Sequence, residues 1–92
     1  MQIRFYIDPV RGEPHIHGHD VSEDEAIEVL EHPSEDRHGR EGSRAALGQT
    51  ASGRYLRVIY VAEAEGVFVI TAYEITGKPL AAFRRRRKKK QQ

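Results

Sequence analysis

The chain has 92 residues, no cysteine and a formal net charge of +1. This length fits one domain with a modest core, and the lack of cysteine excludes disulfides, thiolate metal sites and thiol nucleophiles. The apolar runs are far shorter than the roughly 20 residues that cross a bilayer, and the N-terminal segment is too short and too mixed for a signal peptide. We therefore expect a cytoplasmic protein with no membrane partner.

The basic residues are unevenly distributed along the chain. Seven of the 15 lie in the run Arg84–Lys90, so residues 1–83 carry 8 basic against 14 acidic side chains, a formal charge of −6. This asymmetry predicts a polyanionic partner for the run, usually nucleic acid, although the run is also suited to fold back onto its own acidic surface or to bind anionic lipid. We expect residues 1–83 to form a single domain and residues 84–92 to be a disordered basic tail.

The first half of the chain predicts one strand and one helix. Residues 3–7 alternate loosely between apolar and polar side chains, which favours a strand. Ser22 and Glu25 have the spacing of a capping box at a helix start, and Pro33 ends that helix. The segment 34–42 is polar and contains glycine, so it is expected to be a mobile loop.

The second half predicts three consecutive strands. The segment 44–49 is the weakest, whereas 54–61 and 67–74 are rich in β-branched and aromatic residues and are expected to pair antiparallel. Residues 80–83 fit a short helix or a further edge strand, and the sequence does not choose between them. The order predicts an α+β fold in which a three-strand meander and the N-terminal strand form an antiparallel sheet, with one or two helices on one face.

Residues 19–26 read His-Asp-Val-Ser-Glu-Asp-Glu-Ala and stand at the expected helix start. They resemble the Lys-His-Gly-Val-Ser-x-Glu-Glu-Ala segment at a helix start in the BrnT toxin family. Residues 54–60 are similar to its Arg-x-Leu-x-Val-x-Tyr strand, and residues 69–72 to the Ile-Ile-Ser-Ala of the next strand. The resemblance covers approximately residues 19–78. It implies a RelE-like fold, toxin-type ribonuclease activity on RNA, and an antitoxin protein as partner.

Two strand residues are candidates for chemistry on a phosphate. A metal-independent ribonuclease must remove a proton from a 2′-hydroxyl, stabilise a phosphorane and protonate the 5′ leaving oxygen. The two-residue period of a strand places Tyr73 on one face with Val69 and Thr71. If that face meets the face of Arg57, then Arg57 neutralises phosphate charge and Tyr73 donates a proton. The alternative is that Tyr73 is a packing residue and Arg57 a surface charge.

Three histidines at alternate positions are a further candidate site. If the segment is extended, His15, His17 and His19 point the same way, a pattern known for Zn²⁺; if it is helical, His15 and His19 share a face. Because no fourth ligand is evident, we expect no metal and no other cofactor. His19 carries the family resemblance and is predicted to be a general acid or base, the alternative being that the histidines only face solvent or cap a helix.

The predicted nucleic-acid-binding residues are all basic: Arg44, Arg54, Lys78, Arg84, Arg85, Arg86 and Arg87. Guanidinium groups match phosphate oxygens, and binding through such a run is salt dependent and largely blind to base sequence. The sequence thus predicts a protein that binds RNA and is a candidate endoribonuclease. Two alternatives stay open: a non-catalytic nucleic-acid-binding module that uses the basic run, and a protein-interaction domain whose acidic helix docks a basic partner.

Overall fold

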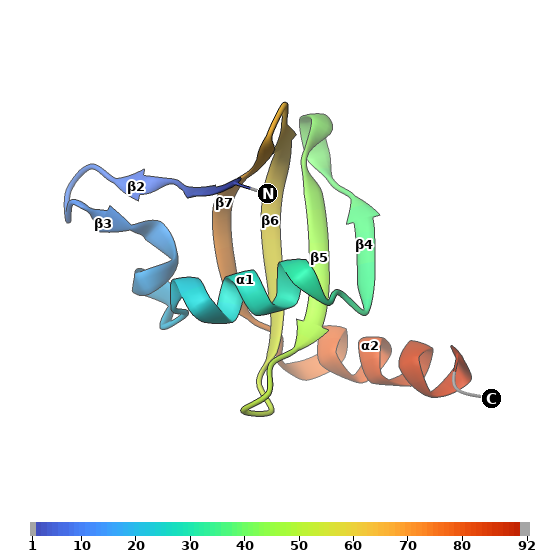
Figure 1. The fold of residues 1–92 in the computed structure, drawn as a ribbon. Helices are drawn as coiled ribbons and strands as arrows, with labels where there is room; N and C mark the ends of the chain where they lie inside the picture. The colour runs from blue at the N-terminus through green and yellow to red at the C-terminus, as the bar shows by residue number, and fades with distance from the viewer. Residues whose placement is uncertain (1, 91–92) are drawn as a thin grey trace.

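The computed structural model describes the backbone of residues 2–90 and the side chains of residues 2–89. Two α-helices, two short 3-10 helices and seven strands make up this part of the chain (Figure 1). The helices are η1 (His15–His19), α1 (Glu23–Glu31), η2 (Arg40–Gly42) and α2 (Gly77–Lys90). The strands are β1 (Gln2–Phe5), β2 (Ile7–Asp8), β3 (Glu13–Pro14), β4 (Glu35–His38), β5 (Arg44–Gln49), β6 (Tyr55–Glu63) and β7 (Gly66–Glu74).

The main sheet has the order β1-β7-β6-β5-β4, and β2 and β3 form a separate hairpin. The predicted meander is present as β5, β6 and β7, so the α+β class is confirmed. The sheet is nevertheless mixed, because β1 pairs parallel to β7. Gly66 permits this pairing: a Cβ atom there would lie 1.7 Å from the carbonyl oxygen of Gln2.

A bulge in β7 changes which side chains share a face of the sheet. The register between β6 and β7 shifts in mid-strand and leaves Ile70 as an extra residue. Val69 is therefore fully buried, whereas Thr71 and Tyr73 lie on the opposite face. The expectation that these three residues share one face is wrong, because the two-residue period holds only for an unbroken strand.

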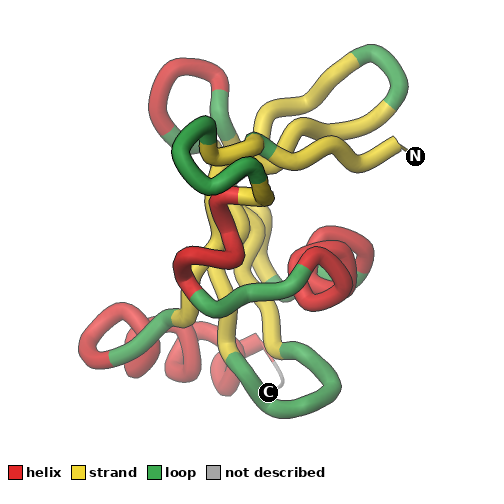
Figure 2. Tube along the Cα trace, turned by 90° about the vertical axis from the view of Figure 1, so that its left-hand side faces the viewer, coloured by secondary structure: helices red, strands yellow, loops and turns green. Residues whose placement is uncertain are grey.

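The two α-helices cover opposite faces of the sheet, not the single face that we expected (Figure 2). The helix α1 packs on the face that carries the main core, and α2 packs on the lower end of the other face. The main core comprises Ile16, Val21, Ala26, Val29, Ala46, Leu56, Val58, Tyr60, Val67, Val69 and Ala72. The smaller core under α2 comprises Leu47, Ile75 and Phe83. Both sheet faces need apolar cover because the strands alternate apolar side chains between them.

The predicted start of α1 is confirmed in detail. The Ser22 hydroxyl accepts a hydrogen bond from the backbone N–H of Glu25 at 3.2 Å, and the Glu25 carboxylate accepts one from the N–H of Ser22 at 3.1 Å. This reciprocal pair satisfies donors that the first helical turn leaves open. The helix ends at Glu31, just before Pro33, as the sequence predicts.

Residues 34–42 are not a plain loop, since β4 forms the edge of the sheet beside β5. The strand is highly charged, which is why its sequence does not look like a strand, and charged side chains are common on sheet edges. Asp36 is held by Arg44 at 3.0 Å and by the hydroxyl of Tyr60 at 2.6 Å. Burial and the bond to Asp36 both raise the pKa of Tyr60.

The basic run is helical, whereas we expected it to be disordered. Residues 84–90 continue α2 without a break, so the disordered tail is wrong for them, and the domain boundary that we placed after residue 83 falls inside a helix. Arginine and lysine are good helix formers, and cations are stabilised near a helix C-terminus. Phe83, only 1% exposed, anchors the helix, and Arg86 pairs with Glu35 of β4. The remainder of the expected tail, residues 91–92, lies outside the described residues.

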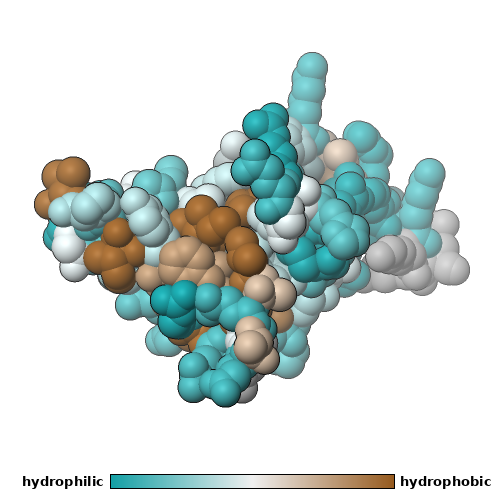
Figure 3. Space-filling model, turned by 90° about the horizontal axis from the view of Figure 1, so that it is seen from above, coloured by the Kyte–Doolittle hydropathy of each residue, from teal (hydrophilic) through white to brown (hydrophobic). Residues whose placement is uncertain are grey.

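The β2–β3 hairpin projects from the sheet, and apolar patches lie among polar ones at this end of the molecule (Figure 3). Ile7 is 48% exposed and Val10, in its turn, is 91% exposed. Within residues 2–90, no helix is long and apolar enough to cross a membrane.

Candidate functional site

The three predicted catalytic residues come from distant parts of the chain and lie together. The register pairs Arg57 of β6 with Tyr73 of β7. Arg57 Nη1 donates a hydrogen bond to the Tyr73 hydroxyl at 3.2 Å, and its guanidinium lies 5.7 Å from the centre of that ring. The His19 ring meets the Tyr73 ring edge-on, with 6.2 Å between centroids. We call these residues the Arg57 cluster.

The position of His19 follows from how the N-terminal segment runs. Because β1 pairs with only the first part of β7, η1 takes its place beside the rest of that strand. The chain is fixed there by backbone bonds from Tyr6 to Val69 and from His15 to Tyr6, at 2.8 and 2.9 Å. As a result, the last residue of η1 stands at the sheet edge next to Tyr73.

Two further aromatic residues extend the Arg57 cluster along this edge. The His15 ring lies 5.2 Å from that of His19 and 6.0 Å from that of Tyr6. The sequence offered one signal for this arrangement, the four-residue spacing of His15 and His19 in a helical segment. Nothing in the sequence pointed to Tyr6.

The histidines do not form a metal site among the described residues. Their segment is a 3-10 helix, so the three side chains do not point the same way. His17 instead turns to Glu23, and their hydrogen bond is the main cause that lowers the pKa of Glu23. Within residues 2–89 no group of three histidine or acidic side chains is placed to hold a metal ion.

Arg57 differs from the other predicted arginines on the sheet because its charge is not neutralised. Arg44 is paired with Asp36 at 3.0 Å, and Arg54 is paired with Glu25 at 2.9 Å and with Glu74 at 3.2 Å. Half-buried Arg57 contacts the Tyr73 hydroxyl but forms no ion pair with any carboxylate of the described residues. Its positive charge is therefore available to an anion from outside the chain.

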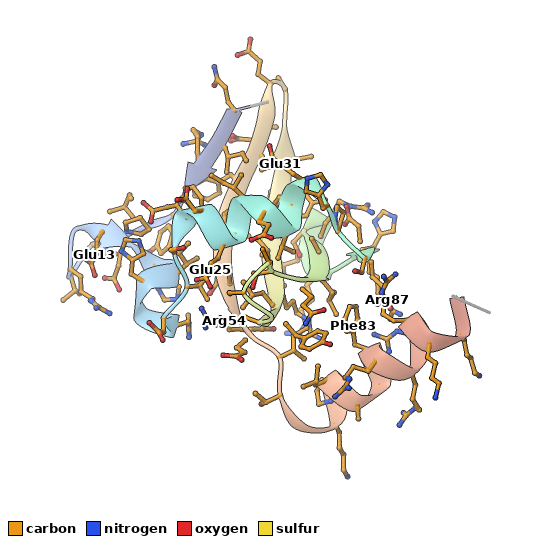
Figure 4. All side chains as sticks on the ribbon, turned by 60° about the horizontal axis from the view of Figure 1, so that its bottom comes forward. Glu13, Glu25, Glu31, Arg54, Phe83 and Arg87 are labelled. Carbon is orange, nitrogen blue, oxygen red and sulfur yellow. The ribbon has the colours of Figure 1, made fainter. Side chains whose placement is uncertain are left out.

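Arg54 has a structural role in this arrangement. It joins the start of α1 to the start of β6, and Figure 4 shows Arg54 and Glu25 pointing toward each other. It also donates to the carbonyl oxygen of Asp20 at 2.9 Å. Burial raises the pKa of Glu25, but hydrogen bonds from Ser22 and the guanidinium of Arg54 outweigh it and hold the pKa below 4.5.

This contact predicts a pH dependence of folding. Because the folded-state pKa of Glu25 is depressed, the stabilisation is fully present above about pH 4.5 and is lost as the pH falls through the folded-state value. We expect the free energy of unfolding of Glu25→Gln to fall less between pH 6 and pH 3 than that of the wild type. Urea denaturation at several pH values measures this, with Glu31→Gln, an exposed carboxylate at the other end of α1, as control. Parallel pH curves for wild type and Glu25→Gln would contradict it.

The basic residues of α2 fall into two groups. Arg86 is paired with Glu35 through two bonds of 2.7 and 3.0 Å, and this contact raises the pKa of Arg86. The others in the described part of the run make no ion pair with a described carboxylate. Four of them line one surface pocket, and we call them the α2 cations: Arg84, Arg85, Arg87 and Lys88. Lys78 is exposed at the first turn of the helix.

One of the α2 cations, Arg84, lies near the strand that carries Arg57. Tyr55 and Arg57 are two residues apart on β6, so they share a face about 7 Å apart. Tyr55 meets Phe83 edge-on at 5.9 Å, and the guanidinium of Arg84 lies 6.0 Å above its ring. Figure 4 shows Phe83 and Arg87 on the side of α2 that faces the sheet. One face of the sheet thus carries Tyr73, Arg57 and Tyr55, with Arg84 of α2 over the ring of Tyr55.

Comparisons with known protein families, with curated proteins and with solved structures give no match for this chain.

Proposed function

We propose that the protein is a RelE/BrnT-like ribonuclease that binds RNA on the sheet face carrying α2 and cleaves it without a metal ion. The observation that carries the proposal is the state of Arg57. It is half-buried, has no carboxylate partner among the described residues, and touches a tyrosine that itself contacts a histidine. A phosphodiester is a ligand that such a group of side chains suits.

The Arg57 cluster can supply each step of the reaction. His19 accepts the proton of the 2′-hydroxyl as its oxygen attacks phosphorus, and Arg57 stabilises the charge of the phosphorane. The bond to the 5′-oxygen then breaks, and the Tyr73 hydroxyl protonates that oxygen. The products are a 2′,3′-cyclic phosphate and a free 5′-hydroxyl.

The α2 cations support RNA as the substrate. They are uncompensated and lie on the same face as the Arg57 cluster, so the flanking phosphates of a strand can bind them while one phosphate reaches Arg57. Of the predicted nucleic-acid-binding residues, Lys78, Arg84, Arg85 and Arg87 fit this role. Arg44, Arg54 and Arg86 are already paired and serve the fold. As in other toxins of this type, an antitoxin protein that covers this face is the proposed partner.

Incubation of the purified protein with single-stranded RNA in the presence of EDTA tests the proposal. We expect fragments ending in a 2′,3′-cyclic phosphate, because the 2′-oxygen is the nucleophile. An oligonucleotide of the same sequence with 2′-deoxyribose should bind but stay intact. If RNA is bound and never cleaved at any pH between 5 and 9, the ribonuclease proposal fails. The free α2 cations would then favour the alternative, a non-catalytic RNA-binding module.

A further inference from the structure

A pocket of about 610 Å³ lies where α2 meets the ends of the sheet strands. Its walls combine uncharged side chains with positively charged ones. One part of the lining is Ser34, Gln49, Tyr55 and Phe83, and the other part is the four α2 cations. The volume falls in the range of pockets that hold small organic ligands.

The lining restricts the chemistry of the ligand. An apolar ligand would remove water from four cations without supplying a counter-charge, which is unfavourable. A simple anion such as phosphate would use the cations but leave the half-buried ring of Tyr55 unused. A ligand that uses the whole lining has a flat ring and a negative charge, and a nucleotide has both.

Gln49 adds a group that can recognise the edge of a base. Its side-chain nitrogen donates to the carbonyl oxygen of Gly53 at 3.2 Å, which holds the amide in place. The amide oxygen has no hydrogen-bond donor among the described residues, and it is therefore able to accept a bond from a ligand. Tyr55 is half-buried beside it, with Arg84 over its ring.

We infer that this pocket is a nucleotide subsite. The base lies against Tyr55 with its edge at Gln49, and the phosphate lies among the α2 cations. The inference rests on the proposed function and deepens it, because Tyr55 and Arg57 are neighbours on the same face of β6. The pocket then holds a nucleotide next to the scissile phosphate and selects which base stands there.

Binding of free mononucleotides to the whole protein tests this inference. Titration calorimetry with AMP, CMP, GMP and UMP is compared with ribose 5-phosphate and with inorganic phosphate. We expect at least one nucleotide to bind about tenfold more tightly than ribose 5-phosphate, because stacking on an aromatic side chain stabilises a bound base. Equal affinity for ribose 5-phosphate would mean a site for phosphate alone and would overturn the inference.

Variants test whether the nucleotide binds in this pocket. Tyr55→Leu is expected to weaken the preferred nucleotide about tenfold, whereas Tyr6→Leu, at an exposed tyrosine outside the pocket, should not change it. Because Tyr55 contacts Phe83, a melting curve must show that the variant is folded. Gln49→Ala, at an exposed position, gives a second test and should reduce the difference between bases. Wild-type affinity and base preference in both variants would place the ligand elsewhere and overturn the inference.

Arg57→Ala separates this inference from the proposed function. It removes the guanidinium of the Arg57 cluster but leaves the pocket lining intact, so nucleotide affinity should equal that of the wild type. If the wild-type protein cleaves RNA but binds no mononucleotide, the subsite inference is wrong and the ribonuclease proposal stands. If it binds a mononucleotide but cleaves no RNA, the subsite inference is supported and the ribonuclease proposal is wrong.

Discussion

Replacing Arg57 with alanine is expected to lower the rate of RNA cleavage by about 100-fold or more while the protein remains folded. Removal of a single group that stabilises transition-state charge typically costs this much. Arg57 is suited to that part because its only polar side-chain contact among the described residues is the Tyr73 hydroxyl. The loss should appear in the rate of single-turnover cleavage more than in RNA affinity, since the α2 cations still hold the strand.

The matched control is Arg40→Ala, which removes the same charge from an exposed residue of η2. Arg40→Ala should cleave at the wild-type rate. If the effect of Arg57→Ala came only from a general loss of positive charge, Arg40→Ala would be slowed as well. Arg57→Lys keeps a cation but not the planar fork and should recover only part of the rate. If Arg57→Ala cleaves as fast as Arg40→Ala, the assignment of Arg57 to catalysis is wrong.

The sequence predicted the elements that depend on local signals. The capping box of Ser22 and Glu25, and the strands on either side of the turn at residues 50–53, rest on neighbouring residues, so their patterns are visible without a structure. The pairing of Arg57 with Tyr73 was predicted only on the condition that the faces of their two strands meet. It holds because of the bulge at Ile70, an irregularity that periodicity cannot reveal.

Two of the errors share a physical cause, since both concern a charged segment stabilised by distant partners. The strand β4 looks like a loop because its side chains are charged, and the basic run looks like a disordered tail for the same reason. One contact links the two segments: Arg86 of α2 binds Glu35 of β4, 51 residues away in sequence. Likewise, β1, which pairs parallel with β7, comes from the other end of the chain. No residue near β7 in sequence indicates the direction of this partner strand.

The fold also divides the predicted binding residues into those that are ion-paired within the chain and those that are not. Composition identified seven basic residues as candidates, but it could not say which of them carry a charge that is free to bind RNA. Arg54 is the clearest case, because Glu25 and Glu74 lie far from it in sequence and both neutralise it in the fold. Lys78, Arg84, Arg85 and Arg87 are the predicted binding residues that form no ion pair with a described carboxylate, and all four lie on α2.

Replacing Phe83 with alanine is expected to have the largest effect on stability. The side chain is 1% exposed and packs with Leu47 and Ile75 in the core under α2. Phenylalanine-to-alanine changes in a core typically lower the free energy of unfolding by about 3–5 kcal/mol. For a small domain whose total stability is about 5–15 kcal/mol, such a loss is a large fraction, and urea denaturation followed by circular dichroism measures it.

The same substitution should also reduce RNA affinity, because Phe83 fixes the helix that carries the α2 cations. Phe83→Leu keeps an apolar side chain against Leu47 and is expected to cost less than about 1.5 kcal/mol. RNA affinity of Phe83→Leu should stay near that of the wild type, which separates loss of anchoring from loss of the aromatic ring. If Phe83→Ala lowers stability by less than about 1 kcal/mol and binds RNA normally, then α2 is not held to the sheet by this core. The cations would in that case act as a mobile charged segment, and the pocket beneath them could not select a base.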